Sequence, residues 1–278
     1  MYKKLDKLIN NSKKAKNEGM LHEYLIGRII DQNNFNFQLK LKNVHDTPIV
    51  ERIDSYKVHQ KLKKEYQWYF AEKKTVETHK DFNKIVWWCW LQGLSEAPVL
   101  SKTCLNSARR MFSDYKFNIV TIDNLNNFIE IPEYIIKKYK AGIIKAATFS
   151  DIIRLMLLDK YGGLWLDATV LCTNDKIKRI VEETPCFVFK NGVLENNKDI
   201  KISSWFLSCC PGNLLVHDTK RLMLSYWKNH NFTESYYIMH LLFTLVTEKY
   251  PDLWENIPTY SNVPPHILVT ELNSKFSE

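Results

Sequence analysis

The sequence has few of the two residues that most often interrupt regular structure. Its 278 residues include only eight glycines and nine prolines, whereas 13% of the residues are aromatic. This composition excludes collagen-like and low-complexity proteins. The balance of 45% hydrophobic and 25% charged residues also excludes an intrinsically disordered chain. We therefore expect a globular protein with a dense aromatic interior.

Long apolar segments and a regular cysteine pattern are also missing. The longest unbroken apolar run, residues 85–91, is far shorter than the roughly 20 residues that a membrane-spanning helix requires. The first residues contain no apolar block of the kind found in a secretory signal, and the six cysteines follow no regular spacing. We therefore expect a cytoplasmic protein with reduced, mostly buried thiols and no zinc knuckle.

Positive charge is concentrated near the start of the chain. The net charge is +8, and residues 1–83 hold 17 lysines and arginines against 11 aspartates and glutamates. Apolar residues at helical spacing, such as Leu5, Leu8 and Ile9, predict helices there. We expect a basic helical N-terminal extension at residues 1–83. Its charge suits a solvated face, an anionic membrane face, a nucleic acid or a polyanionic substrate.

From residue 84 the pattern changes to alternating strands and helices. Strands are predicted at residues 85–91, 117–122 and 164–171. Helices are predicted at residues 98–111, 132–140, 143–161 and 236–249. This order is typical of an α/β protein with a doubly wound, parallel sheet. We expect it to form one domain, residues 84–278.

A single carboxylate interrupts the last predicted strand. Asp167 lies in the apolar segment Leu-Trp-Leu-Asp-Ala-Thr-Val-Leu, and a buried carboxylate is too costly without a cation or hydrogen-bond donors. Strand alternation places Trp165, Asp167 and Thr169 on one face near the carboxyl end, where open α/β sheets bind ligands. Such a carboxylate suits a Mg²⁺ or Mn²⁺ ion that bridges to phosphate oxygens. The alternative is an aspartate that caps a turn.

Two further charged residues precede this strand on a predicted helix. Asp151 and Arg154 are three positions apart and therefore share a helix face. Such a pair suits the hydroxyl groups of a sugar. Residues 148–151 also fit a capping box, in which case Asp151 and Arg154 form a surface ion pair.

Two sequence blocks together resemble a known enzyme family. Residues 149–154 read Phe-Ser-Asp-Ile-Ile-Arg, and residues 161–169 read Tyr-Gly-Gly-Leu-Trp-Leu-Asp-Ala-Thr. They resemble the signature of glycosyltransferase family 32, the sugar transferases with a DXD motif, and more narrowly its bacterial capsular polysaccharide synthesis branch. Residues 85–93 are similar to the opening Ile-Trp-x-x-Trp-x-Gln-Gly strand of that branch, with one extra aromatic residue. The resemblance covers residues 84–268.

The resemblance implies a GT-A type, Rossmann-like nucleotide-sugar-binding domain, a UDP-sugar donor and a divalent metal, Mn²⁺ or Mg²⁺. It also implies transfer with retention of anomeric configuration. Asp151 and Arg154 match the family's contacts to the donor sugar, and Asp167 matches its carboxylate for the metal and diphosphate. Thr169 stands where the broader family has a second aspartate. We expect it to act through a metal-bound water or to contact the diphosphate.

Weaker signals mark the surroundings of this site. The Gln92-Gly93 turn is a candidate donor contact, because Gly93 allows close approach of the backbone, or it is an ordinary turn. Ser204 and Trp205 suit either an acceptor wall or core packing. The tryptophans of the first strand suit stacking on uracil but more often belong to a core.

His240 is a candidate from a later part of the chain. It lies on the more polar stripe of the helix predicted at residues 236–249, so its imidazole is expected to face a cleft. There it would serve as a further metal ligand. The alternatives are an acceptor contact or a hydrogen-bonded helix histidine, because imidazole is a borderline ligand beside oxygen donors.

The sequence therefore predicts a metal-dependent retaining glycosyltransferase that moves a hexose from a UDP-sugar to a saccharide acceptor in capsular or surface polysaccharide biosynthesis. We expect the acceptor to be lipid-linked and the protein to associate peripherally with the inner face of the cell membrane. One alternative is a sugar-phosphate transferase on the same fold, which would release UMP. Another is a nucleic-acid-binding protein with a degenerate catalytic domain, but no nucleic-acid-binding motif is recognised and we expect no such partner.

Overall fold

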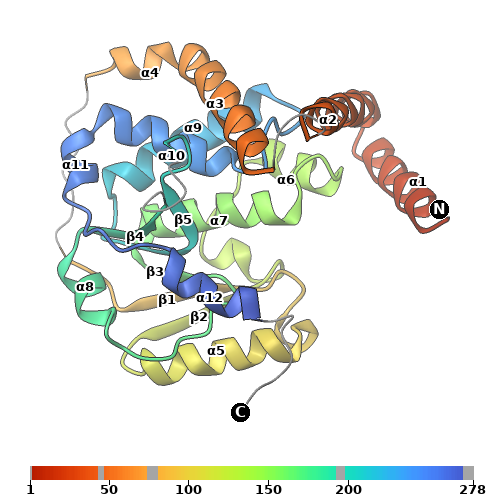
Figure 1. Ribbon diagram of the computed structural model, residues 1–278. Coiled ribbons are helices and arrows are strands. Elements are labelled where there is room, and N and C mark those ends of the chain that lie inside the picture. Colours follow the sequence, from red (N-terminus) through yellow and green to blue (C-terminus); the bar gives the residue numbers. More distant parts are fainter. Residues whose placement is uncertain (1, 43–46, 74–80, 192–197, 272–278) are drawn as a thin grey trace.

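The computed structural model describes residues 2–42, 47–73, 81–191 and 198–271, and a five-stranded sheet forms its centre (Figure 1). The strands are β1 (Ile85–Cys89), β2 (Lys116–Val120), β3 (Gly163–Leu166), β4 (Cys186–Lys190) and β5 (Ile202–Cys209). Their order is β2-β1-β3-β5-β4. Strand β1 is parallel to β2 and β3, whereas β5 is antiparallel to β3 and β4. The α/β class is confirmed, but β5 departs from the expected parallel sheet.

The helices surround this sheet and extend beyond it. Before the sheet come α1 (Tyr2–Asn17), α2 (Leu21–Lys42), α3 (Thr47–Glu65) and α4 (Gln67–Ala71). The sheet region contains α5 (Val99–Met111), α6 (Glu133–Lys140), α7 (Ala146–Tyr161) and α8 (Lys178–Glu183). The chain continues with α9 (Leu214–Asn229), α10 (Ile238–Lys249), α11 (Pro251–Glu255) and α12 (Val263–Glu271). The helices predicted around 98–111, 132–140, 143–161 and 236–249 are therefore confirmed.

Alternating side chains of the strands support a separate core on each face of the sheet. Trp87 and Trp165 point to the larger core, which includes α6, α7, α9 and α10. Val86 and Leu164 point to the other face, which α5 and α8 cover. Both faces of β1 and β3 are thus buried, as expected for strands in the middle of an α/β sheet.

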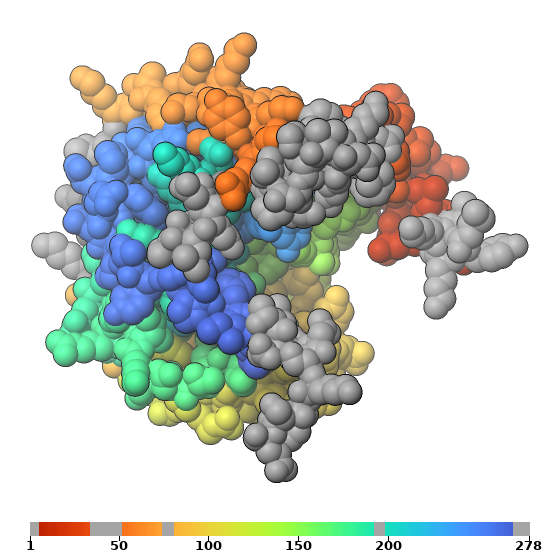
Figure 2. Space-filling view, viewed as in Figure 1, coloured from red at the N-terminus to blue at the C-terminus, as the bar shows by residue number. Residues whose placement is uncertain are grey.

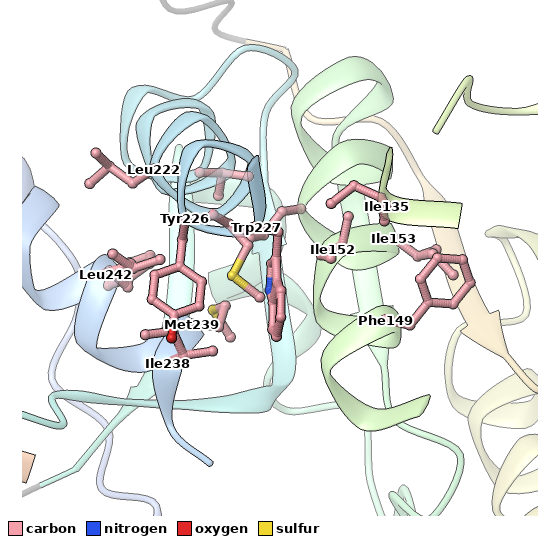
Figure 3. Packing of buried hydrophobic residues seen from close by; sticks show 14 of the residues in the cluster. Ile135, Phe149, Ile152, Ile153, Leu222, Tyr226, Trp227, Ile238, Met239 and Leu242 are labelled. Atoms are coloured by element: carbon pink, nitrogen blue, oxygen red, sulfur yellow. The ribbon is translucent and has the colours of Figure 1, made fainter. Parts of the chain in front are cut away.

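Aromatic residues fill the larger core (Figure 3). Tyr226 and Trp227 of α9 are fully buried beside residues of α10 such as Met239. On the α7 side, the ring of Phe149 stacks on Tyr139 with centroids 4.0 Å apart. This packing fixes α7 and α10 relative to the sheet, and both helices contribute to the site described below.

Helices α3 and α4 are docked on this larger core. Tyr66 and Tyr69 are buried in the same cluster as α9 and α10. The Tyr69 hydroxyl donates a 3.0 Å hydrogen bond to the buried carboxylate of Asp218 on α9. The ring nitrogens of His59 on α3 form ion pairs with Asp199 at 2.5 Å and with Glu248 at 3.0 Å. The predicted helical character of the N-terminal region is confirmed for its described residues, whereas the domain boundary at 83/84 remains a prediction.

No helix in the part of the chain that the structure describes is both long and apolar enough to cross a bilayer.

Candidate active site

A pocket of ≈ 240 Å³ lies beside the carboxyl ends of β1 and β3. Strand β1 leads into Cys89 and Trp90 at its lining, and the segment after β3 contributes residues 167–169. The first turns of α7 form another side. Ser204 of β5 and residues around the start of α10 complete the lining. Parallel strands of α/β sheets bind ligands at this edge, so the topology makes this pocket the candidate active site.

Arg154 joins the two carboxylates of the pocket. Its Nη1 donates to Asp151 Oδ1 at 2.7 Å, and its Nη2 donates to Asp167 Oδ1 at 2.6 Å. The Arg154 side chain is only 3% exposed, and its guanidinium lies 4.9 Å from the centre of the Trp165 ring. Trp165 Nε1 also donates to Asp167 Oδ1, at 2.6 Å. The expectation that Asp167 meets a cation or hydrogen-bond donors is confirmed, but the expectation that its carboxylate is buried is wrong, because the side chain is 35% exposed.

The strand that carries Asp167 is shorter than predicted. Strand β3 ends at Leu166, and the Val170 amide donates to the Asp167 carbonyl oxygen at 3.0 Å, which closes a turn. The prediction that Trp165, Asp167 and Thr169 share one strand face is therefore wrong. The turn-capping alternative located Asp167 correctly, but its side chain binds Arg154 and Trp165.

The capping-box interpretation of residues 148–151 is wrong. Helix α7 begins at Ala146 and has Lys145 as its N-cap, so Asp151 lies inside the helix. Two alanines with high helix propensity precede Thr148 and extend the helix toward its N-terminus. The pair of Asp151 and Arg154 is a largely buried ion pair in the pocket and not a surface pair.

Burial changes the protonation of two pocket residues. It raises the pKa of Asp151 to about 6, an effect that Arg154 opposes and Asp167 reinforces. Burial and the positive charge of Arg154 lower the pKa of His240 to about 3. His240 is therefore neutral near pH 7, whereas Asp151 is mostly ionised. Two carboxylates then face one guanidinium, so the pocket has an excess of negative charge.

His240 lines the pocket as predicted, but only part of its helix stripe does so. Its Nδ1 is buried without a hydrogen-bond partner among the described residues, and Tyr236 lines the pocket nearby. Thr244 and Thr247 of the same stripe are fully buried. Their hydroxyls donate to backbone carbonyl oxygens, Thr244 to Asp199 and Thr247 to Thr244. The prediction that the His240 imidazole faces a cleft is therefore confirmed, whereas the two threonines of its stripe belong to the core.

The structure separates the weaker candidates from one another. Ser204 lines the pocket, whereas Trp205 stacks on Phe189 with centroids 4.9 Å apart. Gln92 is exposed, and neither it nor Gly93 contributes to the lining. A donor contact from either one remains a prediction. Trp87 and Trp88 of β1 are core residues. Trp90, which follows β1, is the tryptophan of the first predicted strand that reaches the pocket.

Comparison with known proteins gives this pocket a family context. The family model "Capsular polysaccharide synthesis protein" matches residues 38–278. The chain belongs to this family. Among curated proteins no match is found. Among solved structures, the chain is similar to the PaToxG glycosyltransferase, with 13% identity, a TM-score of 0.37 and coverage of 83% of this chain and 91% of that chain.

The metal-binding capacity of this capsular polysaccharide synthesis protein rests on few ligands. Its described residues contain no group of three or more His, Cys, Asp or Glu side chains arranged to hold a metal ion. Asp167 Oδ1 is occupied by Arg154 and Trp165, which leaves Oδ2 and the nearby Thr169 hydroxyl. Mg²⁺ usually binds through one or two carboxylates together with substrate phosphates. The residues therefore fit a cation that a diphosphate helps to hold, and do not fit a site made by protein ligands alone.

Two residues of the α7 lining in this family member are not among those predicted from the sequence. Ala147 and Ser150 line the pocket beside Asp151 and Arg154. These four residues follow the spacing i, i+3, i+4, i+7, which defines one helix face. The combination of small and polar residues on that face was the signal that could have identified them.

Proposed function

We propose that this protein is a glycosyltransferase that moves a hexose from a UDP-sugar to a saccharide acceptor in capsular or surface polysaccharide biosynthesis. The proposal includes a GT-A type domain and retention of anomeric configuration. The observation that carries it is the convergence of Asp151, Arg154 and Asp167 in the pocket beside the parallel strands. Membership of a capsular polysaccharide synthesis family supports the same conclusion.

In this proposal Asp151 and Arg154 position the donor sugar. Short hydrogen bonds to the two carboxylates fix Nη1 and Nη2 of Arg154. Its buried Nε has no partner among the described residues. A side chain held in this way loses little entropy when a ligand binds. Asp151 has a second carboxylate oxygen with which to accept a hydrogen bond from a sugar hydroxyl. Orientation of the sugar favours attack by the acceptor hydroxyl.

The excess of negative charge explains why a diphosphate would need a cation here. Asp167 Oδ2 and the Thr169 hydroxyl, directly or through water, would hold Mn²⁺ or Mg²⁺, and the neutral imidazole of His240 is a weaker third candidate. Such a cation would neutralise the charge that develops on the leaving diphosphate. Trp165 orients the carboxylate of Asp167 through its indole hydrogen bond.

The remaining pocket wall suits the acceptor. Tyr236 is 73% exposed although it lines the pocket, and an exposed tyrosine offers an apolar ring and a polar hydroxyl. Ser204 adds a second hydroxyl from β5. We assign this side to a saccharide acceptor, lipid-linked in the simplest form of the proposal.

Release of UDP from a panel of UDP-sugars tests the proposal without knowledge of the acceptor. Purified protein with Mn²⁺ should hydrolyse one UDP-sugar slowly to UDP and free sugar, and chelation of the metal should stop the reaction. UMP as the product would favour a sugar-phosphate transferase. Absence of turnover with every donor and added acceptor would count against a transferase.

A further inference from the structure

Helix α1 has an apolar stripe that the rest of the protein covers only in part. At its C-terminal end, Ala15 is fully buried in the same cluster as Met20 and Tyr24. Nearer the N-terminus, Leu8 is 38% exposed and Ile9 is 44% exposed. The helix sequence contains six lysines and one aspartate. The uncovered part of the stripe therefore lies on a strongly basic helix.

Helix α2 adds a second uncovered apolar surface. One of its faces is packed, because a Cβ on Gly27 would approach the Asn231 carbonyl oxygen to 3.3 Å. Another face exposes Leu25, Ile26 and Ile29, the last of them 61% exposed. Helix α1 stands out from the body of the molecule (Figure 2). We call α1 together with residues 21–33 of α2 the N-terminal arm.

The arm lies close to the pocket. Lys145, at the start of α7, is two positions before the pocket residue Ala147. Lys145 is exposed, and Asp31, Arg28 and Lys7 of the arm lie near enough to interact with its charge. The arm therefore lies close to the end of α7 that contributes to the pocket.

We propose that the N-terminal arm binds the surface of an anionic lipid bilayer. A basic helix with an exposed apolar stripe and low overall hydrophobicity is suited to the plane of a membrane interface. Lysines beside the stripe would lie near anionic headgroups, which attract them. A second copy of this chain is a poorer occupant, because a symmetric contact would bring the same lysines together. The membrane would then hold the pocket near a lipid-linked acceptor, a consequence that rests on the proposed function.

Flotation of the full-length protein with vesicles tests this inference. The protein should float with phosphatidylcholine vesicles that contain phosphatidylglycerol and should not float with pure phosphatidylcholine vesicles. Each lysine near an anionic surface strengthens binding about fivefold, so Lys13→Gln/Lys14→Gln should weaken it on the order of 25-fold at low salt. Leu8→Ser/Ile9→Ser should weaken binding at both low and high salt, because salt screens charge and not apolar contact.

Helix α5 supplies matched controls. Val99 and Leu100 form an exposed apolar pair there, and Arg109 and Arg110 form an exposed basic pair. Substitution of the first pair by serine and of the second by glutamine should leave flotation unchanged. Equal losses in these controls, or wild-type flotation of both α1 variants, would overturn the inference.

Two further measurements separate this inference from its alternatives. A dimer in sedimentation that the Leu8→Ser/Ile9→Ser variant loses would assign the face to a second copy and overturn the membrane proposal. Acceptor-free UDP release should be unchanged in the α1 variants. Vesicle binding without hydrolysis of any UDP-sugar would leave the membrane inference standing and remove the proposed function.

Discussion

Arg154 is the residue on which the charges of the pocket converge. It is buried, and each of two guanidinium nitrogens binds a different carboxylate, Asp151 on its own helix and Asp167 after β3. A planar guanidinium donates hydrogen bonds in two fixed directions at the same time, and a lysine ammonium cannot reproduce this geometry. The ion pairs therefore fix the position of the Asp167 turn relative to α7.

Asp151 predicts a pH dependence for the enzyme. Its pKa is raised to about 6 by burial, with an opposing effect of Arg154 and a reinforcing effect of Asp167. As pH falls below about 6, the carboxylate becomes protonated and loses its charge against Arg154. We expect donor turnover to fall by up to about tenfold per pH unit below that value. A pH profile of UDP release should show this inflection, and Asp151→Asn should be slow and lack it; the same inflection in both proteins would contradict the role of Asp151.

His240 predicts a change in the metal requirement. Its imidazole is neutral near pH 7, because burial and Arg154 lower its pKa to about 3, so it has a free lone pair for a cation. Loss of one weak ligand should reduce metal affinity more than the rate at saturation. We expect His240→Ala to raise the Mn²⁺ concentration for half-maximal UDP release by about tenfold, because the cation would lose one weak ligand. An unchanged metal requirement with a raised acceptor KM would move His240 to the acceptor side.

At the scale of elements, the junction between α7 and β3 sets the position of Asp167. Gly163 has a φ of 92°, and a Cβ there would lie 2.5 Å from the Ile85 carbonyl oxygen on the neighbouring strand. Close approach of β3 to β1 therefore requires glycine at this position.

The junction predicts a large loss of stability for Gly163→Ala. Backbone strain and the contact with β1 should together lower the free energy of unfolding by about 3 kcal/mol, measured by urea denaturation. Gly142→Ala is the matched control, because Gly142 has a φ of 76° but nothing within 4 Å of an added Cβ. Equal losses in the two variants would show that the contact between β1 and β3 contributes nothing.

The docking of α3 predicts that stability depends on pH through His59. Burial lowers its pKa, but Glu248 and Asp199 raise it by more, so the net shift from 6.5 is upward. Folding therefore favours the protonated form. This contribution is fully present below about pH 6.5 and is lost as pH rises through the raised pKa. The thermal midpoint should fall over that range, and His59→Gln should remove this component; an identical pH dependence in the variant would contradict it.

Some elements could be predicted from sequence and others could not. Strand β1 and helices α5, α6 and α7 follow from apolar runs, helical spacing and the Pro98 and Pro132 starts. Three serines, at 203, 204 and 208, obscure the apolar pattern of strand β5 in the sequence. Ser203 and Ser208 are buried, and the Ser203 hydroxyl donates to Asn191 at 2.8 Å. The early end of β3 does not follow from the sequence either, because the contact of Arg154 with Asp167 forms only in the folded protein.

At the scale of the whole molecule, the fold divides the basic charge of the N-terminal region. Lys61 and Lys63 of α3 form ion pairs with Glu234 and Glu248 of the core. Helix α1 carries six lysines and one aspartate outside this docked surface. A charge count along the sequence showed the excess but not this division, which depends on which helices pack on the core.

Only part of the candidate site can be predicted from the sequence. Asp151, Arg154 and Asp167 lie within one short stretch of sequence, so local pattern was enough to select them. Ser204 lies on β5 and Tyr236 just before α10, and they reach the pocket only because β5 packs beside β3 and α7 and α10 packs on β5. Their contribution is a property of tertiary structure.

In the proposed function, Asp167 supports transfer from a UDP-sugar. Acceptor-free UDP release at saturating Mn²⁺ by the wild type, Asp167→Asn and Thr169→Ala, with folding checked by circular dichroism, tests this role. We expect Asp167→Asn to fold and to lose nearly all turnover. Thr169→Ala should lose roughly tenfold or less, since one hydrogen bond contributes about 0.5–1.5 kcal/mol. Near-native turnover of Asp167→Asn would show that the carboxylate of Asp167 does not have this role.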